Sequence, residues 1–167
     1  MRVCWIAGRP AAGKSTLARR VVERLAARGL RGELLDSDDV RRAITPAPTY
    51  SAAERLIFYR ALAYAARRLA GAGIPVVVAA TTGSRILLDA VVEVCPRVVL
   101  TYARCDPSIA EARDPKGLYA AARAGATSTL PGVGVPFEPP HAPDHVIDTE
   151  RSVPDEAINR IASDLLR

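Results

Sequence analysis

The chain has 167 residues, 49% of them hydrophobic and 25% charged, and its formal net charge at pH 7 is +5. This length predicts a single domain over residues 1–167, and the lack of any apolar stretch of 18 residues excludes a membrane-spanning helix. The basic residues are scattered and form no block of five or six, which disfavours a nucleic acid polymer as the partner.

Short β-rich runs alternate with longer segments of helical period along the chain. Strands are predicted at residues 3–7, 33–35, 75–80, 97–102 and 145–147. Helices are predicted at residues 14–27, 37–43, 52–70, 85–94 and 154–166. This alternation is typical of an α/β fold in three layers, with a parallel five-stranded sheet between helices on both faces.

Residues 114–143 break the alternation, because glycine and proline recur throughout them. They predict a long loop with one helical stretch near residues 118–124. Long loops in compact domains are usually functional or disordered, and in an enzyme the obvious function is a lid over the substrates.

The sequence GRPAAGKS at residues 8–15 matches the phosphate-binding pattern G-x-x-x-x-G-K-[ST]. Its place between a predicted strand and a predicted helix is the context that such a loop requires, so a glycine-rich turn without a ligand is a remote alternative. Lys14 is predicted to bind the β- and γ-phosphates of ATP, and Ser15 is predicted to bind Mg²⁺. The predicted ATP-binding residues here are Gly8, Ala11, Ala12, Gly13, Lys14, Ser15 and Thr16.

Acidic residues follow the second predicted strand, in the run Leu35-Asp36-Ser37-Asp38-Asp39. The carboxyl ends of the strands are where open α/β sheets hold ligands, so Asp36 or Asp38 could hold magnesium or accept a proton from an attacking hydroxyl group. The alternative is that an aspartate or Ser37 only caps the next helix. Catalysis is favoured for Asp38, and Arg41 is a candidate to bind an anionic acceptor.

Three cysteines, Cys4, Cys95 and Cys105, lie in or beside apolar runs without metal-ligand spacing, which predicts buried reduced thiols. An apparent strand begins at residue 3 and leaves no room for a signal peptide, so a cytoplasmic location is expected.

Several motifs beyond the phosphate loop resemble the adenylylsulfate kinase family, whose members phosphorylate the ribose 3'-hydroxyl of adenosine 5'-phosphosulfate (APS). The most specific is RDPKGLY at residues 113–119, followed by ARAG at 122–125, PFEPP at 136–140 and Pro143-Asp144. The resemblance extends to residues 3–5 and 35–41, and to Tyr50-Ser51 with Glu54-Arg55. It covers nearly the whole chain.

The resemblance implies a role for individual residues. Asp38 would assist deprotonation of the acceptor hydroxyl and hold magnesium with Ser15, and Arg113 would lie near the ATP base. Lys116 would meet phosphate or sulfate from the lid. A homodimer is also implied. The resulting catalytic set is Asp38, Lys14, Asp36 and Thr82, and the acceptor-binding set is Arg41, Tyr50, Arg55, Phe58, Thr81, Thr82, Lys116 and Leu130.

The chain departs from the family pattern mainly on the acceptor side. Ile57-Phe58 replace the usual Glu-Asn, and Ala79-Ala80-Thr81-Thr82-Gly83 replace Ser-Phe-Ile-Ser-Pro. Leu130 stands where the family has a lid phenylalanine, which leaves Tyr50 as the one aromatic residue expected to stack on the acceptor base.

The leading hypothesis is therefore an ATP-dependent kinase, with Mg²⁺ as cofactor, that converts APS to 3'-phosphoadenosine 5'-phosphosulfate in sulfate activation. One alternative is a kinase of the same fold for another nucleotide or small metabolite of a specialised pathway. A second is a nucleotide-binding regulatory subunit without catalysis, which the intact Lys14, Ser15 and Asp38 disfavour.

Overall fold

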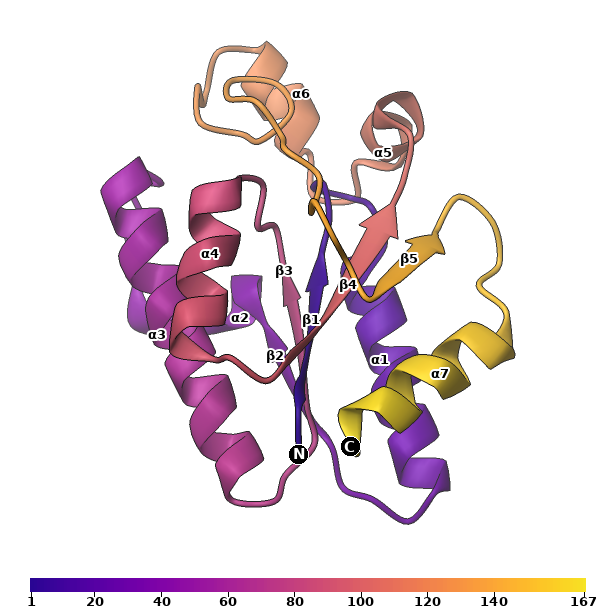
Figure 1. Cartoon of the computed structure of the whole chain (residues 1–167). Helices are drawn as coiled ribbons and strands as arrows, with labels where there is room; N and C mark the ends of the chain where they lie inside the picture. The colour runs from indigo at the N-terminus through magenta and orange to yellow at the C-terminus, as the bar shows by residue number, and fades with distance from the viewer.

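A computed structural model describes all of residues 1–167. Its centre is a five-stranded sheet in the order β2-β3-β1-β4-β5, in which all neighbouring strands are parallel. The strands are β1 Val3–Ala7, β2 Glu33–Asp36, β3 Val76–Ala80, β4 Val98–Arg104 and β5 His145–Asp148. All five predicted strands are present, and the predicted α/β fold class is confirmed (Figure 1).

Seven helices accompany the sheet: α1 Lys14–Ala27, α2 Ser37–Ile44, α3 Ala52–Gly71, α4 Arg85–Val94, α5 Pro107–Arg113, α6 Leu118–Arg123 and α7 Asp155–Leu165. Sequence analysis did not predict α5, which has too few residues to show a helical period. Its start was nevertheless signalled. Asp106 accepts a hydrogen bond from the Ser108 N–H as N-cap, and Pro107 is the first residue of the helix.

The sheet buries both of its faces because side chains alternate along each strand. In β1, Val3, Trp5 and Ala7 belong to the core beneath α3 and α4. Cys4 and Ile6 belong to the core beneath α1 and α7. Helix pairs therefore cover opposite faces of the sheet, as Figure 1 shows, and the three layers match the prediction.

Residues 114–143 lie over the carboxyl ends of the strands (Figure 1). They include α6 close to the predicted 118–124, while most of the remainder is irregular. A small third core joins α5, α6 and Leu130 to the phosphate loop through Ala12. The segment thus packs on the loop that it covers.

None of the helices is both long enough and apolar enough to cross a bilayer. All three cysteines are buried and unpaired, which confirms the prediction of buried reduced thiols. Burial raises the pKa of the Cys4 thiol to about 12, so this thiol is unreactive at neutral pH.

Candidate active site

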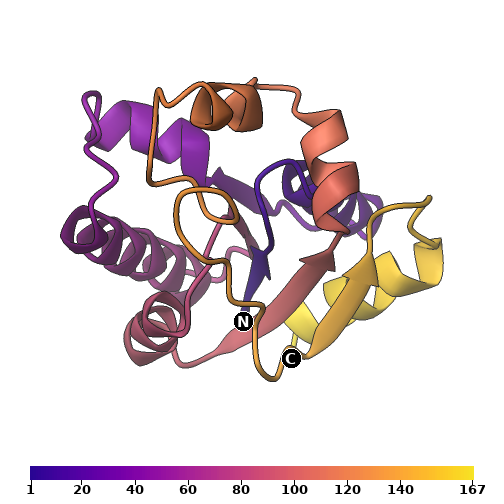
Figure 2. The ribbon, with the colours of Figure 1, turned by 90° about the horizontal axis from the view of Figure 1, so that it is seen from above.

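A cavity of about 1290 Å³ opens at the carboxyl ends of the strands, the edge seen from above in Figure 2. Its wall comes from the phosphate loop, the start of α2, the turn before α3 and residues from 113 to 131. Cationic side chains outnumber the four aspartates in the wall, which suits anionic ligands. The cationic residues are Lys14, Arg19, Arg20, Arg41, Arg42, Arg55, Arg113, Lys116 and Arg151.

The phosphate loop connects β1 to α1 and places backbone N–H groups at the start of that helix. Gly13 has a φ of 76°, in the left-handed region that favours glycine. Gly8 lies so close to β4 that an added Cβ would be 2.7 Å from the Ala103 carbonyl oxygen. Both glycines are therefore required by the backbone, and the open helix N-terminus favours phosphate.

Lys14 is the first residue of α1, and its Nζ donates to the Arg9 carbonyl oxygen at 2.6 Å. Burial lowers the pKa of Lys14 to about 8, although Asp38 and Asp36 act in the opposite direction. The amine of this half-buried residue thus lies against the curl of the loop and lines the cavity.

Ser15 donates from its Oγ to Asp36 Oδ2 at 2.5 Å. Asp36 ends β2 and is also the N-cap of α2, where its Oδ1 accepts from the Asp38 N–H at 3.0 Å. The capping alternative therefore applies to Asp36, while its second oxygen faces the phosphate loop. Together the serine and the aspartate place two hard oxygen donors beside that loop.

Asp38 does not cap the helix. Its exposed carboxylate forms an ion pair with Lys116, and this contact joins α2 to the segment over the sheet. The hydrogen bond that Lys116 donates to Asp38 is the main cause that raises the pKa of Lys116. A predicted catalytic carboxylate and a predicted anion-binding lysine thus meet across the cavity.

The turn around Lys116 is fixed by Asp114, whose carboxylate accepts from the N–H groups of Leu118, Tyr119 and Ala120 at 2.7 to 3.1 Å. The Tyr119 hydroxyl donates to the Pro10 carbonyl oxygen at 3.2 Å, which ties α6 to the phosphate loop. Sequence analysis gave neither Asp114 nor Tyr119 a role, although both lie in the RDPKGLY motif.

Arg113, predicted near the ATP base, ends α5 and lines the cavity. Its Nη2 donates to the carbonyl oxygens of Thr149 and Glu150 at 2.9 and 3.1 Å. These bonds hold the arginine against the loop after β5, on the phosphate-loop side of the cavity.

The acceptor residues predicted on α2 and α3 gather at the other end. Arg41 lies with its guanidinium 3.8 Å from the centre of the Phe58 ring and 5.0 Å from that of Tyr50. Arg55 donates to the Tyr50 carbonyl oxygen at 3.0 Å and to the Thr129 carbonyl oxygen at 2.7 Å. The second bond joins α3 to the segment over the sheet.

Two of the predicted acceptor residues lie beneath the cavity instead of in its wall. Thr82 is fully buried and accepts from Trp5 Nε1 at 2.8 Å, so its hydroxyl is used within the core. Phe58 is 2% exposed and supports Arg41 from below. The placement of these two residues corrects the expectation of direct contact, because neither side chain is accessible to a ligand.

Most other predicted residues do line the cavity, and the remainder, Gly8 and Ala12, are buried behind the loop surface. Leu130 is in the wall but only 8% exposed, because it also packs in the small third core. The residues in the wall are Ala11, Gly13, Lys14, Ser15, Thr16, Asp36, Asp38, Arg41, Tyr50, Arg55, Thr81, Arg113, Lys116 and Leu130.

Glu54 is the main residue at this site that sequence analysis missed. Its carboxylate accepts from Arg41 Nη1 at 2.5 Å and from donors on Thr49 and Tyr50. The hydrogen bond from the Thr49 hydroxyl is the main cause that lowers the pKa of Glu54. A signal existed: Ser51-Ala-Ala-Glu54 has the pattern of a capping box, and the Ser51 Oγ accepts from the Glu54 N–H.

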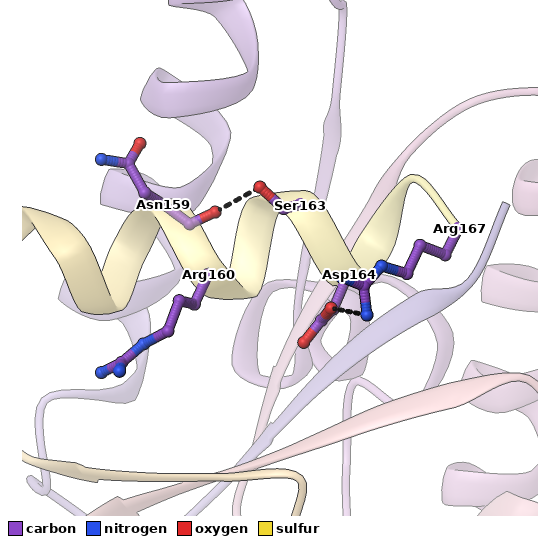
Figure 3. Close-up of a pocket in the computed structure, with 5 residues that line it drawn as sticks. All are labelled: Asn159, Arg160, Ser163, Asp164 and Arg167. Carbon is purple, nitrogen blue, oxygen red and sulfur yellow. Dashed lines mark hydrogen bonds and ion pairs between the residues drawn. The ribbon is translucent and has the colours of Figure 1, made fainter.

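A smaller hollow of about 350 Å³ lies on α7, lined by Asn159, Arg160, Ser163, Asp164 and Arg167 (Figure 3). Asp164 pairs with Arg167 at 2.9 Å, and Ser163 donates to the Asn159 carbonyl oxygen at 2.8 Å. Asn159 and Ser163 also accept from Arg28, and Asp164 contacts His145, so most of these polar groups already have partners within the protein.

A phosphate loop between β1 and α1, with carboxylates at the carboxyl end of β2 and a basic segment above, defines the class of P-loop kinases. The comparisons with known proteins identify the family within that class. The family model for adenylylsulphate kinase matches residues 1–148.

Two relatives and one solved structure are similar to this chain over nearly their whole lengths. A probable adenylyl-sulfate kinase of Archaeoglobus fulgidus is 37% identical over 150 residues, which cover 90% of this chain and 97% of the relative. An adenylyl-sulfate kinase of Burkholderia ambifaria is 36% identical over 172 residues, which cover 98% of this chain and 91% of the relative. The solved structure of the Mycobacterium tuberculosis APS kinase CysC, in complex with AMPPNP and APS, matches with a TM-score of 0.90 and 30% identity. This match covers 99% of this chain and 96% of that one.

The chain belongs to the adenylylsulphate kinase family. The resemblance found in the sequence is thereby confirmed, and the protein is an ATP-dependent phosphotransferase with an alcohol group as acceptor.

Proposed function

We propose that this protein transfers the γ-phosphate of ATP to the ribose 3'-hydroxyl of APS, giving 3'-phosphoadenosine 5'-phosphosulfate. One observation carries the proposal: the phosphate loop, the Asp38 carboxylate and the Arg41–Arg55 pair all face a single basic cavity. The cavity volume of about 1290 Å³ exceeds the range of roughly 300–1,000 Å³ that is typical of a pocket for one drug-sized ligand, which suits a site for two substrates. Family membership supplies the acceptor.

The chemistry of phosphoryl transfer depends mostly on positioning and on neutralising charge. Lys14 would bind the β- and γ-phosphates from within the loop, and Arg113 would lie at the ATP base. Asp38 would accept the proton of the 3'-hydroxyl as the oxygen attacks the γ-phosphorus. Lys116, which pairs with Asp38, would then exchange this partner for the anionic groups of the substrates.

Magnesium fits the residues present, and we propose Ser15 and Asp38 as its ligands, together with Asp36, which the structure places beside Ser15. Mg²⁺ prefers oxygen donors and is commonly held by one or two carboxylates plus substrate phosphates, so a site without three clustered acidic or histidine side chains suits it. When bound, the ion supplies neutralisation of the charge on the phosphates.

At the acceptor end, Arg41, Tyr50, Arg55, Thr81, Lys116 and Leu130 are proposed to form the binding surface. The arginines and Lys116 provide charge for the phosphosulfate, and Tyr50 provides a ring for the base. Phe58 and Thr82 would act from below by supporting Arg41 and Trp5.

We also propose a role for the segment over the sheet, a cellular location and an oligomeric state. Residues 114–143 would serve as the lid of a single domain, because α6 and Leu130 pack on the phosphate loop beneath them. Three reduced cysteines suit the reducing cytoplasm. A homodimer is proposed from family membership, and size-exclusion chromatography with light scattering tests it.

A second candidate is another nucleotide or a small metabolite as the acceptor. It is favoured by Leu130, an aliphatic side chain in a cavity wall where Tyr50 supplies the only exposed aromatic ring. A ring that stacks on a base contributes about 1–3 kcal/mol in nucleic-acid sites, so this leucine would weaken the binding of adenine.

A coupled assay of ADP release with ATP, Mg²⁺ and a panel of acceptors tests these functions. Saturable turnover of APS, with little turnover of other nucleotides, would support the proposal. Preference for another acceptor would favour the second candidate. If ATP binds tightly but no acceptor of the panel causes release of ADP, the result would instead support a regulatory subunit.

A further inference from the structure

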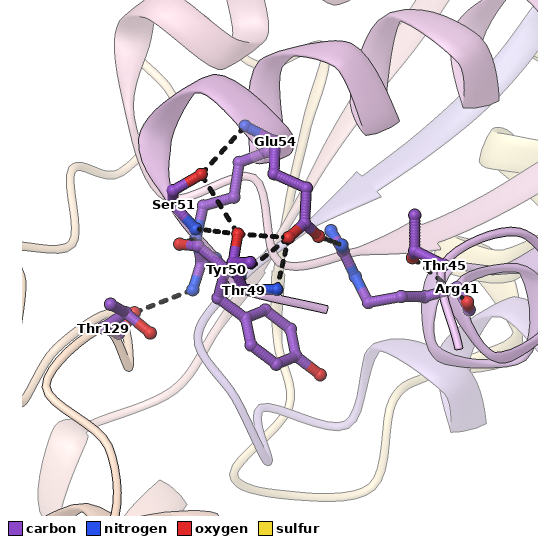
Figure 4. A network of polar contacts seen from close by, with 8 residues as sticks. Arg41, Thr45, Thr49, Tyr50, Ser51, Glu54 and Thr129 are labelled. Atoms are coloured by element: carbon purple, nitrogen blue, oxygen red, sulfur yellow. Dashed lines mark hydrogen bonds and ion pairs between the residues drawn. The ribbon is translucent and has the colours of Figure 1, made fainter. Parts of the chain in front are cut away.

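Glu54 lies in the first turn of α3 behind the acceptor end of the cavity, and it is not part of the cavity wall. Its carboxylate accepts from Arg41 Nη1 at 2.5 Å, from the Thr49 hydroxyl at 2.5 Å, from the Tyr50 N–H at 3.0 Å and from the Thr49 N–H. Figure 4 shows these contacts converging on one carboxylate. The donors come from α2 and from the turn before α3.

Arg41 is the charged side chain that depends most on this arrangement. Arg41 is only 6% exposed, and a guanidinium removed from water is costly unless a partner with opposite charge is present. Glu54 is that partner, and the Phe58 ring supports the other side of the guanidinium at 3.8 Å. The carboxylate thereby fixes where the arginine's remaining donors lie in the cavity wall.

Tyr50 depends on the same carboxylate for its backbone conformation. Its φ of 54° is in the left-handed region, which a residue with a Cβ adopts only when its surroundings enforce it. Two bonds enforce it here: the Tyr50 N–H donates to Glu54, and Arg55 donates to the Tyr50 carbonyl oxygen at 3.0 Å. The Tyr50 ring lies beside both arginines as a result.

We propose that Glu54 is the positioning residue of the acceptor site, holding Arg41 and the Tyr50 ring in the arrangement that binds the acceptor. This inference rests on the proposed function, because it takes Arg41 and Tyr50 as acceptor ligands. Glu54 acts only through these neighbours. None of its hydrogen bonds is with the phosphate loop, so we expect binding of ATP and the chemical step not to depend on it.

The first test is Glu54→Gln, which keeps the size of the side chain and removes the charge that pairs with Arg41. The expected result is a KM for APS raised about tenfold, the loss typical of one hydrogen bond to a charged group, with kcat and the KM for ATP within about twofold of wild type. Glu93→Gln is the matched control. Glu93 is an exposed glutamate on α4 that accepts two bonds from Arg60 outside the cavity, and the control should leave all three constants unchanged.

A double-mutant cycle separates positioning from a general structural effect. If Glu54 acts through Arg41, Glu54→Gln should change the KM for APS much less in an Arg41→Met background than in wild type. Thr49→Val removes one donor to Glu54 but leaves its bond to Arg41, so a smaller rise in KM of about threefold is expected. This variant also tests the inference if Glu54→Gln does not fold.

The outcomes distinguish the two proposals. A wild-type enzyme that turns over other acceptors but not APS overturns the proposed function and this inference with it. Turnover of APS by wild type with an unchanged KM in Glu54→Gln and Thr49→Val overturns the inference alone. Equal losses in kcat and in both KM values, or additive effects in the cycle, would assign Glu54 a merely structural part and also overturn it.

Discussion

The two ends of the cavity are constructed in different ways. At the nucleotide end, the predicted phosphate-binding groups come from one contiguous stretch, residues 8–16, whose backbone wraps around the Lys14 amine. At the acceptor end, Arg41 on α2 pairs with Glu54 on α3, and Arg55 on α3 donates to the carbonyl oxygen of Thr129. The first end depends mainly on the backbone shape of the phosphate loop and on Lys14, whereas the second depends on a network of side chains.

This difference teaches where the protein can change its substrate. Substitutions around the phosphate loop meet a tightly packed backbone, as the close approach of Gly8 to Ala103 shows, and they should reduce catalysis as a whole. Substitutions in the acceptor network should mainly change the KM for the acceptor. The departures from the family pattern at Phe58 and Leu130 lie in or beneath this second region.

Lys14→Ala should have the largest effect, a loss of at least about 10³-fold in kcat, because the loop loses its only cation at the transferred phosphate. ADP release under saturating substrates measures it. Arg28→Ala, at the far end of α1, removes a cation that binds Asn159 and Ser163 and should leave kcat unchanged. Activity of Lys14→Ala within tenfold of wild type would contradict the proposed function of the loop.

Asp38→Asn should lower kcat by about 10²–10³-fold, the usual contribution of a general base, and leave the KM for ATP within about twofold. The amide keeps the shape of the side chain but cannot take the proton. Asp89→Asn is the control, since Asp89 lies on α4 outside the cavity wall and pairs with Arg85 on an exposed face. Full activity of Asp38→Asn would remove this residue from the mechanism.

Lys116→Met should raise the KM for APS about tenfold and change kcat by less, because it removes a cation that faces the substrates across the cavity. Steady-state kinetics with APS as the varied substrate measure this change. Arg123→Met removes another exposed ion pair of the same segment, to Glu111, outside the cavity wall. An equal rise in both variants would assign the effect to the stability of the segment.

Leu130→Phe should give the smallest effect, a KM for APS lowered about threefold by a second ring beside the acceptor base. Only part of the stacking energy is expected, because Leu130 also packs against the small third core, where a larger ring must fit. The KM values of Leu130→Phe for APS and for other nucleotides, measured in the same assay, decide between the two candidate acceptors. A KM that rises for adenine nucleotides and falls for another acceptor would support the second candidate.

Most of the fold and of the nucleotide end could be predicted from the sequence, because both depend on local signals. Alternating strands and helices define the sheet, and the phosphate loop is a contiguous motif between β1 and α1. The end of β2 placed Asp36 and Asp38 correctly at the cavity. The division of work between them, with Asp36 as the N-cap and Asp38 opposite Lys116, required the structure.

The acceptor end could not be predicted to the same depth. Whether Thr81 or Thr82 faces the cavity depends on how the chain turns after β3, and only the packing of Trp5 against Thr82 decides it. The contacts of Glu54 with Arg41 depend on how α2 and α3 pack, and the left-handed backbone at Tyr50 has no sequence signal. The side-chain contacts of the acceptor end therefore depend on how distant parts of the chain pack together, which local sequence patterns do not predict.

The identity of the phosphorylated product tests the central claim most directly. The wild-type protein is incubated with ATP, Mg²⁺ and APS, and the product is identified by mass spectrometry and ³¹P NMR. The account predicts one added phosphate on the ribose 3'-oxygen, formed with one ADP per product and absent in Asp38→Asn on the same timescale. Recovery of unmodified APS, with phosphate transferred to another acceptor of the panel, would contradict it.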